Sequence, residues 1–184
     1  EVLVFGLVPG IGSYSSWDGR IEGRLAQAIC SIQAIKGVGF GDGFKLTGIP
    51  GSQAHDEIFP GGEGPTEAFG FHRTTNHAGG IEGGMTNGET VIVKGAMKPL
   101  PTLTKPLQSI DIETGEAAQA LRERTDSCTV PAAGVVAEAM TAIVFADAYL
   151  EKFGGDNVAD TKAAIAAYHD RIAGGLSSER AKES

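Results

Sequence analysis

The sequence predicts a mixed fold of the α+β or layered α/β kind, on three observations. Short apolar runs that suit buried strands occur at residues 2–8 and 91–97. A longer stretch carries apolar residues at helical spacing, as in Ile21, Leu25 and Ile29. The two kinds of element are segregated along the chain rather than strictly alternating, which favours these two classes over a regular alternation.

The composition is that of a globular protein. The chain has 184 residues, of which 41% are hydrophobic and 21% charged, and this excludes wholesale disorder. The net charge of -8 disfavours nucleic acid as a partner, because a phosphate backbone normally selects a basic surface. No apolar run approaches the roughly 20 residues of a membrane span, so no membrane association is expected.

Two further features concern the origin of the chain. The two cysteines, Cys30 and Cys128, are too few for a disulfide framework and suit a cytoplasmic protein. The chain opens with Glu1 inside an apolar run and has no initiator Met. We interpret it as a piece of a longer protein.

In the first half, the strand over residues 2–8 should end at the turn formed by Pro9 and Gly10. A helix should follow, with Asp18 as its N-cap and Gly37 as its stop. A brief strand comes next, in which Val38, Phe40 and Phe44 could face inward. Residues 49–85 lose all periodicity and predict a long functional or mobile loop.

The second half predicts two more strands and three helices. The strands cover residues 91–97 and 109–112, and a turn-rich segment joins them. The helices cover residues 115–124, 131–153 and 156–172. Residues 1–173 should form one unit, and residues 174–184 a flexible tail.

Two candidate motifs, a dinucleotide-binding fingerprint and a histidine metal site, lack the required residue spacing. A dinucleotide fingerprint starting at Gly37 and Gly39 would need glycine at position 42, where Asp42 stands, and a helix should follow it. Among the histidines of residues 55–77, no two ligands share a helix face at the spacing that a metal requires. No metal is therefore expected, and these side chains are interpreted as part of a polar loop, with His169 exposed on the last helix.

Two segments carry the chemistry. TNHAGGIEGGMTNG (75–88) is rich enough in glycine for bare backbone to approach a flat or anionic ligand, although a disordered loop would look similar. RTDSCTVPAAG (124–134) joins a guanidinium, a hydroxyl and a carboxylate to a helix N-terminus, which suits an anion. The alternative is an ordinary helix cap with a surface ion pair. Cys128 is interpreted as a buried small residue.

Taken together with GLVPGIGSYSSWDGRIEGRLAQAICSIQAIKGVGFGDGF, GSQAHDE and AMKPLPTLTKPL, these segments resemble the C-terminal half of chorismate synthases over about residues 1–160. The resemblance implies a layered β-α-β-α-β sandwich of the α+β class and a homotetramer. It implies conversion of 5-enolpyruvylshikimate 3-phosphate to chorismate and phosphate with reduced FMN, in a cytoplasmic flavoprotein associated with NADP. The family's N-terminal half, with its catalytic histidines and substrate-binding arginines, is not in this chain.

The resemblance also implies the site residues. Asp126 should be the catalytic proton acceptor beside the flavin. The positions that should bind the flavin are Gln33, Ala34, Gly83, Lys98, Pro99, Leu100, Pro101, Thr102, Arg124 and Thr125.

Two functions remain open on the sequence. The first is the FMN-binding part of a chorismate synthase, which should be inactive without the other half. The second is a non-catalytic oligomerisation or interaction module derived from that enzyme. The intact KPLPT and RTD segments favour the first, because a scaffold has no need of both.

Overall fold

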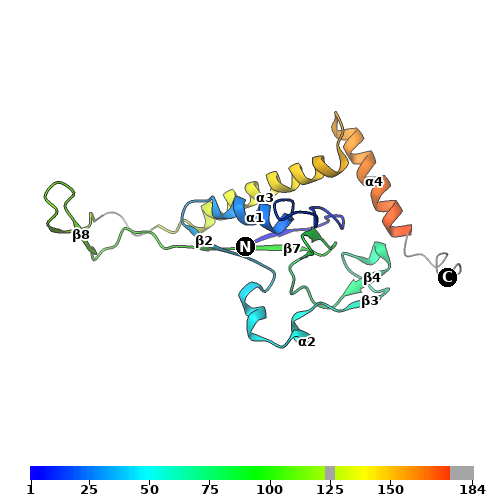
Figure 1. Ribbon diagram of the computed structural model, residues 1–184, viewed down its shortest axis with the longest axis horizontal. Coiled ribbons are helices and arrows are strands. Elements are labelled where there is room, and N and C mark those ends of the chain that lie inside the picture. The colour runs from blue at the N-terminus through cyan, green and yellow to red at the C-terminus, as the bar shows by residue number, and fades with distance from the viewer. Residues whose placement is uncertain (123–126, 175–184) are drawn as a thin grey trace.

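The computed structural model describes residues 1–122 and 127–174 (Figure 1). Its centre is a three-stranded antiparallel sheet in the order β1-β7-β2. The strands are β1 (Val2–Val4), β7 (Val91–Met97) and β2 (Ile35–Phe40). The predicted strand over residues 91–97 is confirmed, and it is the middle strand because it pairs with β1 on one edge and β2 on the other. Its Val91 and Val93 lie in the core with at most 1% of their surface exposed.

The first strand is shorter than the predicted 2–8. The chain leaves the sheet after Val4, passing through Gly6 in the left-handed region at φ +72°. Residues beyond it pair elsewhere, since Gly10 N donates to Thr86 O at 2.7 Å and Gly12 bridges to Met85. Apolar composition alone could not distinguish a continued strand from this change of partner.

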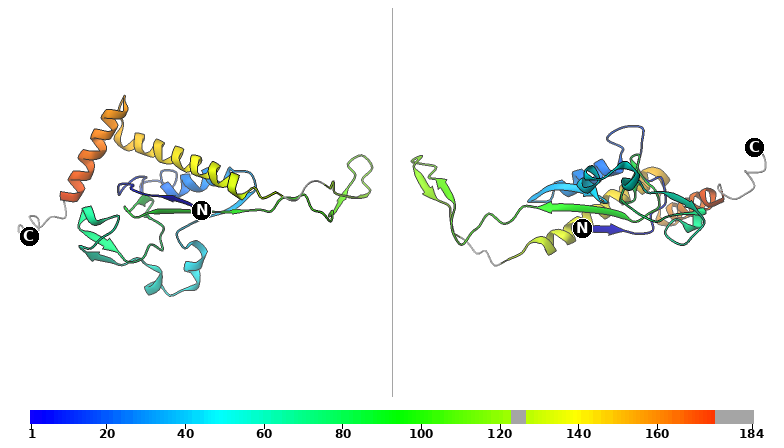
Figure 2. Two further views of the ribbon diagram at one scale, coloured as in Figure 1. Left: turned by 180° about the vertical axis from the view of Figure 1, so that it is seen from behind. Right: turned by 90° about the horizontal axis from the view of Figure 1, so that it is seen from below.

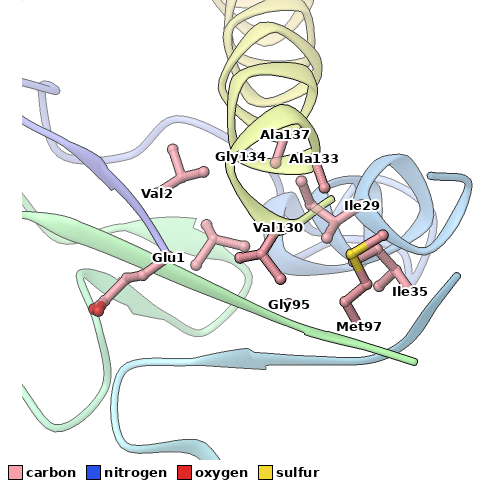
Figure 3. A pocket seen from close by; sticks show the side chains of 11 residues that line it. Glu1, Val2, Ile29, Ile35, Gly95, Met97, Val130, Ala133, Gly134 and Ala137 are labelled. Atoms are coloured by element: carbon pink, nitrogen blue, oxygen red, sulfur yellow. The ribbon is translucent and has the colours of Figure 1, made fainter. Parts of the chain in front are cut away.

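Two helices, α1 (Ile21–Cys30) and α3 (Val130–Phe153), lie along one face of the sheet (Figures 1 and 2). The apolar face of α1 predicted by its spacing is buried, and Ile21 and Leu25 have no exposed surface. The helix begins after Arg20 rather than Asp18 and ends before Ser31. Gly37 is therefore part of β2 and not a helix stop.

The segment predicted as one long loop, residues 49–85, contains several short elements instead. Phe44, expected to face inward, lies just before it in η1 (Gly43–Gly48) and is 85% exposed. The elements of the segment are α2 (Gly51–Ala54), β3 (Ile58–Pro60), η2 (Glu67–Phe69), β4 (Phe71–Arg73), β5 (Ile81–Glu82) and β6, which extends to the next residue (Met85–Thr86). Elements of two to four residues carry no readable periodicity, so the sequence could not predict them.

A hairpin of β8 (Gln108–Ile110) and β9 (Ala117–Gln119) projects away from the body (Figure 1). The predicted helix over residues 115–124 is therefore wrong in its described part. Asp111 makes the reversal, because its carboxylate accepts the backbone N–H groups of Glu113 and Thr114 at 2.9 Å. This turn places residues 117–119 opposite β8 before a helix can start.

The chain closes with α4 (Val158–Gly174), which turns back from the end of α3. Gly154 ends α3 as predicted, at φ +62°. His169 is half-buried rather than fully exposed, since its ring lies 5.1 Å from that of Phe69 between the ring centroids. Of the predicted tail, residues 175–184 lie outside the described residues.

Helix α3 is long and apolar enough to cross a membrane by length and composition, with a mean hydropathy of 1.5 over its most apolar window. This corrects the expectation that no apolar run approaches a membrane span. A core helix of a soluble protein meets the same criterion, but in this chain only 11% of that window is buried. Most of the helix surface is thus left uncovered.

Candidate functional site

Two of the segments predicted to bind a ligand meet at the end of the central strand. Residues 98–102 follow directly after β7, and residues 33–34 form the turn between α1 and β2. The antiparallel register pairs Ile35 with Met97, and the next residue, Lys98, donates its backbone N–H to Ala34 O at 2.7 Å. The structure therefore brings Gln33, Ala34 and Lys98 together from distant parts of the chain.

Ala34 is held in an unfavourable conformation. At φ +66° it is the one non-glycine residue with positive φ among residues 1–122 and 127–174. The left-handed region costs an L-residue roughly 1–2 kcal/mol. Strain of this kind persists where surrounding structure imposes it, and it clusters at functional sites.

Beside this turn lies a hollow of about 390 Å³, formed by the segment after β7 and the segment before α3. Its predicted members are Lys98, Pro99, Leu100 and Thr102. Pro101 belongs to the same segment but does not line the hollow. Among the described lining residues Lys98 is the one charged side chain, so the hollow combines apolar walls with a single cation. Such a lining suits an anionic ligand with an apolar body.

Three predicted residues, Arg124, Thr125 and Asp126, lie outside the described residues. Ser127 and Cys128 follow them in sequence and line the hollow. Cys128 is exposed, so the expectation of a buried small residue is wrong. The reason is its position: Cys128 precedes α3 and lines the hollow, whereas the first buried residue of α3 is Thr141.

Gly83 does not join this group. It lies in the turn between β5 and β6, at the start of α1, where Ile21 N donates to Gly84 O at 2.9 Å. Ala34 follows the other end of α1, and a helix of ten residues is about 15 Å long. Gly83 is exposed at φ +61°, and a Cβ there would meet nothing within 4 Å, so its backbone is open to a ligand.

Sequence reasoning missed a carboxylate that organises the glycine-rich segment. Asp56 accepts the Thr75 hydroxyl at 2.6 Å and the backbone N–H groups of His77 and Ala78 at 2.7 and 2.9 Å. Partial burial raises the pKa of the Asp56 carboxyl, but these hydrogen bonds outweigh it and the net pKa is lowered. Asp56 lies in the segment of residues 49–85, which the sequence predicted only as a loop, and its three hydrogen-bond donors lie about 20 residues further along the chain.

His77 pairs with a carboxylate rather than with backbone alone. Its Nδ1 lies 2.7 Å from Asp42 Oδ2, and this hydrogen bond lowers the pKa of the Asp42 carboxyl. The pair fastens the end of β2 to the glycine-rich segment. In the part of the chain that the structure describes, no group of three or more His, Cys, Asp or Glu could hold a metal ion.

A second missed residue is Arg73, whose side chain is only 6% exposed. Its Nη2 donates to Glu82 Oε2 at 3.0 Å, and Asn87 Nδ2 donates to the same oxygen at 2.8 Å. The Arg73 Nε and Nη1 atoms are buried with no hydrogen-bond partner among the described residues. Glu82 precedes Gly83, so the hydrogen bonds from Arg73 and Asn87 to Glu82 hold one side of the turn. The signal in the sequence was an arginine just before the glycine-rich segment.

The comparisons with known proteins agree with one another. Residues 1–150 match the family described as chorismate synthase. A chorismate synthase from Pelobacter propionicus is 53% identical over 174 residues, which are 94% of this chain and 44% of the relative. One from Arthrobacter sp. is 54% identical over 178 residues, 97% of this chain and 43% of the relative. A crystal structure of chorismate synthase superposes with a TM-score of 0.74 at 43% identity, covering 93% of this chain and 42% of that one.

The fold and the site define the chain as an α+β protein with a hollow suited to an anionic ligand. It spans less than half the length of the relatives it matches. It belongs to the chorismate synthase family, of which it is a C-terminal portion. The expected α+β fold of that family is confirmed.

Proposed function

We propose that this chain is the flavin-binding C-terminal portion of an enzyme that converts 5-enolpyruvylshikimate 3-phosphate to chorismate and phosphate. The reaction removes a phosphate and a ring proton from the substrate without net oxidation or reduction. Membership of the chorismate synthase family supports this reaction class. Within the chain, the observation that carries the proposal is the contact of Ala34 with Lys98 beside an apolar hollow with one described cation.

The residues present fit a flavin mononucleotide. Leu100 and Pro99 offer apolar surface to a ring system, and the Lys98 ammonium can bind a phosphate. Arg124 and Thr125 would add a guanidinium and a hydroxyl for the same anions. The chemistry that reduced FMN would supply when bound is electron density to ease the loss of phosphate, with no net oxidation or reduction.

This chain's own contribution to the chemistry is one proton transfer and the positioning of ligands. Asp126 is the proposed acceptor of the proton, either from the substrate ring or by way of the flavin. Lys98 and Arg124 would hold anionic groups, and the backbone at Gln33 and Ala34 would contact the flavin beside the hollow. Gly83 would contact it from the other end of α1. The net charge of -8 does not oppose an anionic substrate, because the cations are local to the site.

The assembly that we propose is a homotetramer of the complete protein, associated with NADP and located in the cytoplasm. The matched relatives are chorismate synthases of bacteria, and this supports the proposed location. The alternative is a non-catalytic interaction module. The uncovered surface of α3 favours it, but an interaction module would not need a lysine in an apolar hollow.

The test uses the complete protein that contains this chain. Lys98→Gln should raise the dissociation constant for FMN by about tenfold or more, since a hydrogen bond to a charged group contributes about 1.5–3 kcal/mol. Lys36→Gln is the control, because Lys36 is exposed on β2 and does not line the hollow. Equal FMN affinity in the two variants would remove Lys98 from the site.

A second pair of variants separates binding from chemistry. Asp126→Asn should leave FMN affinity within a few fold while turnover falls at least about 100-fold, which is the low end for a general acid–base group. Arg124→Ala should instead weaken FMN or substrate binding. Wild-type single-turnover rates in the Asp126 variant would exclude that residue from the mechanism.

A further inference from the structure

Three side chains from the last two helices hold the segment of residues 8–10. Tyr149 Oη accepts the backbone N–H of Val8 at 3.2 Å, and Tyr168 Oη donates to Pro9 O at 3.0 Å. Lys152 Nζ donates to Gly10 O at 2.9 Å. We call Tyr149, Lys152 and Tyr168 the clasp. It comes from the end of α3 and the middle of α4.

The clasp fits the segment closely. A Cβ at Gly10 would lie 2.8 Å from Tyr168 Oη, and Gly10 has φ +84°, so only glycine is accommodated there. Lys152 Nζ also lies 4.6 Å from the centroid of the Tyr168 ring, and the Phe153 ring is 5.4 Å from it. These contacts hold the Tyr168 ring and the Lys152 ammonium in place, and so orient the two groups that donate to the backbone of residues 9 and 10.

On its other side the same segment is tied to Thr86, which is 3% exposed. Gly10 N donates to Thr86 O at 2.7 Å, and Thr86 N donates to Ile11 O at 3.0 Å. The Thr86 hydroxyl donates to Val8 O at 2.7 Å and accepts from Ile11 N at 2.9 Å. Every polar group of Thr86 is thus bonded to residues 8–11.

Thr86 ends the β5–β6 hairpin, whose turn consists of Gly83 and Gly84. The hairpin pairs only two residues on each strand, and so short a ladder is not stable alone. Its position therefore depends on bonds to its neighbours. These are the hydrogen bonds with residues 8–11, which the clasp holds, together with the Ile21 N to Gly84 O hydrogen bond and the Arg73–Glu82 ion pair.

We propose that the clasp positions the Gly83–Gly84 turn for FMN, which makes Tyr149, Lys152 and Tyr168 positioning residues of the site. The inference rests on the proposed function, because the turn matters only if the complete protein binds the flavin there. Two of the three residues, Lys152 and Tyr168, lie beyond residues 1–150, the range matched by the family. No motif in the sequence pointed to them.

The test compares Tyr168→Phe with wild type in the complete protein. The variant removes the hydroxyl and keeps the ring. Amide hydrogen exchange at Gly10, Ile11 and Thr86 should become faster by about 2- to 10-fold, the range expected for one neutral hydrogen bond. The dissociation constant for FMN should rise by a similar factor, while kcat at saturating FMN stays within about twofold because no reacting group changes.

Two controls and a second variant accompany it. Tyr14→Phe alters a tyrosine that is 79% exposed and should change none of the three readouts. Lys152→Met removes another member of the clasp, and Lys162→Met removes an exposed lysine of α4 as its control. Lys152→Met should reproduce the result of Tyr168→Phe, and it decides the question if that variant does not fold.

Two results would overturn the proposal. One is a lower melting temperature with unchanged exchange and unchanged FMN affinity, since the clasp would then only stabilise α4. The other is faster exchange with wild-type FMN affinity, since the turn would then not serve the flavin. Failure of the proposed function is seen separately, in wild-type protein that binds no FMN.

Discussion

Ala34 is a residue whose conformation and place in the site can be tested separately. Replacing it by glycine should relieve the left-handed strain at φ +66° and raise the free energy of unfolding by about 0.5–1 kcal/mol. Urea denaturation of the complete protein measures this. Ala26→Gly, in the middle of α1, is the matched control and should lower the same quantity by about 0.5–1 kcal/mol. A loss of stability in Ala34→Gly would contradict the strain.

Asp56 predicts a pH dependence whose sign follows from its lowered pKa. The charged carboxylate is the form that accepts the Thr75, His77 and Ala78 hydrogen bonds. Its stabilisation is fully present above the ordinary aspartate pKa of about 3.9 and is lost as the pH falls through the lowered value in the folded state.

Asp56→Asn should therefore lower the free energy of unfolding near pH 7 by about 1–3 kcal/mol and flatten its decline in acid. The measurement is a series of urea midpoints between about pH 2 and pH 7. Asp156→Asn changes an exposed residue before α4 and should show the same dependence of stability on pH as the wild type. If the unfolding free energy of Asp56→Asn declined in acid as steeply as that of the wild type, the three hydrogen bonds to the carboxylate would not stabilise the fold.

Single residues also mark the limit of prediction from sequence. Lys98 and Ala34 could be predicted because KPLPT and SIQAIKG are recognisable segments, and the structure places them together. The role of Asp56 could not, because its three donors lie about 20 residues further along the chain. Cys128 was wrongly predicted to be buried. Its exposure depends on where α3 begins to pack against the rest of the protein, and the first buried residue of that helix is Thr141.

At the scale of elements, prediction succeeded where periodicity is long. The apolar spacing of α1 and the mainly apolar stretch of β7 were both visible, since each spans at least seven residues. It failed for residues 115–124, because the alanine-rich composition favours a helix while the turn at Asp111 forces a hairpin. Short elements held by side-chain hydrogen bonds leave no pattern to read.

The turn of the β5–β6 hairpin gives a matched pair of substitutions. Gly83 and Gly84 both have positive φ, but a Cβ at Gly83 would meet nothing within 4 Å, whereas one at Gly84 would lie 2.6 Å from Ser13 O. Gly83→Ala should therefore cost about 1 kcal/mol of unfolding free energy from backbone strain alone. Gly84→Ala should cost clearly more, because a backbone oxygen has to move. Equal losses in urea denaturation would refute this account of the turn.

At the scale of the whole molecule, α3 has an exposed apolar side that we expect another surface to cover. Val136, Ile143 and Leu150 repeat every seven residues and are 47%, 61% and 54% exposed. The matched relatives have more than half of their length outside this chain. We expect that remaining part to cover this stripe and to supply the other layers of the sandwich.

The chain alone should therefore associate with itself and should not make chorismate with chemically reduced FMN. Apolar stripes of this kind associate in water, and positioning and acid–base groups outside the chain are each worth large factors in rate. Ultracentrifugation and an activity assay measure the two expectations. Activity of the 184-residue chain by itself would overturn the proposed division of catalytic groups.

Mixing with the separately expressed remainder should restore activity. Ile143→Glu should prevent this recovery, because it buries a charge in the expected contact. Ile112→Glu is the control, since Ile112 is 95% exposed at the tip of the β8–β9 hairpin. Recovery that is the same in both variants would show that α3 is not the surface that meets the remainder.

The clasp also has a consequence for synthesis on the ribosome. Tyr168 and Pro9 are 159 residues apart in sequence, and Tyr149 and Val8 are 141 apart. At roughly 5–20 residues per second, Pro9 leaves the peptidyl transferase centre about 8–30 s before Tyr168 is added. During that interval the first strand, and also the glycine turn once residue 84 has been added, lack the hydrogen bonds of the clasp. The speed of translation between residues 9 and 168 thus sets how long the nascent chain stays open to chaperones and proteases.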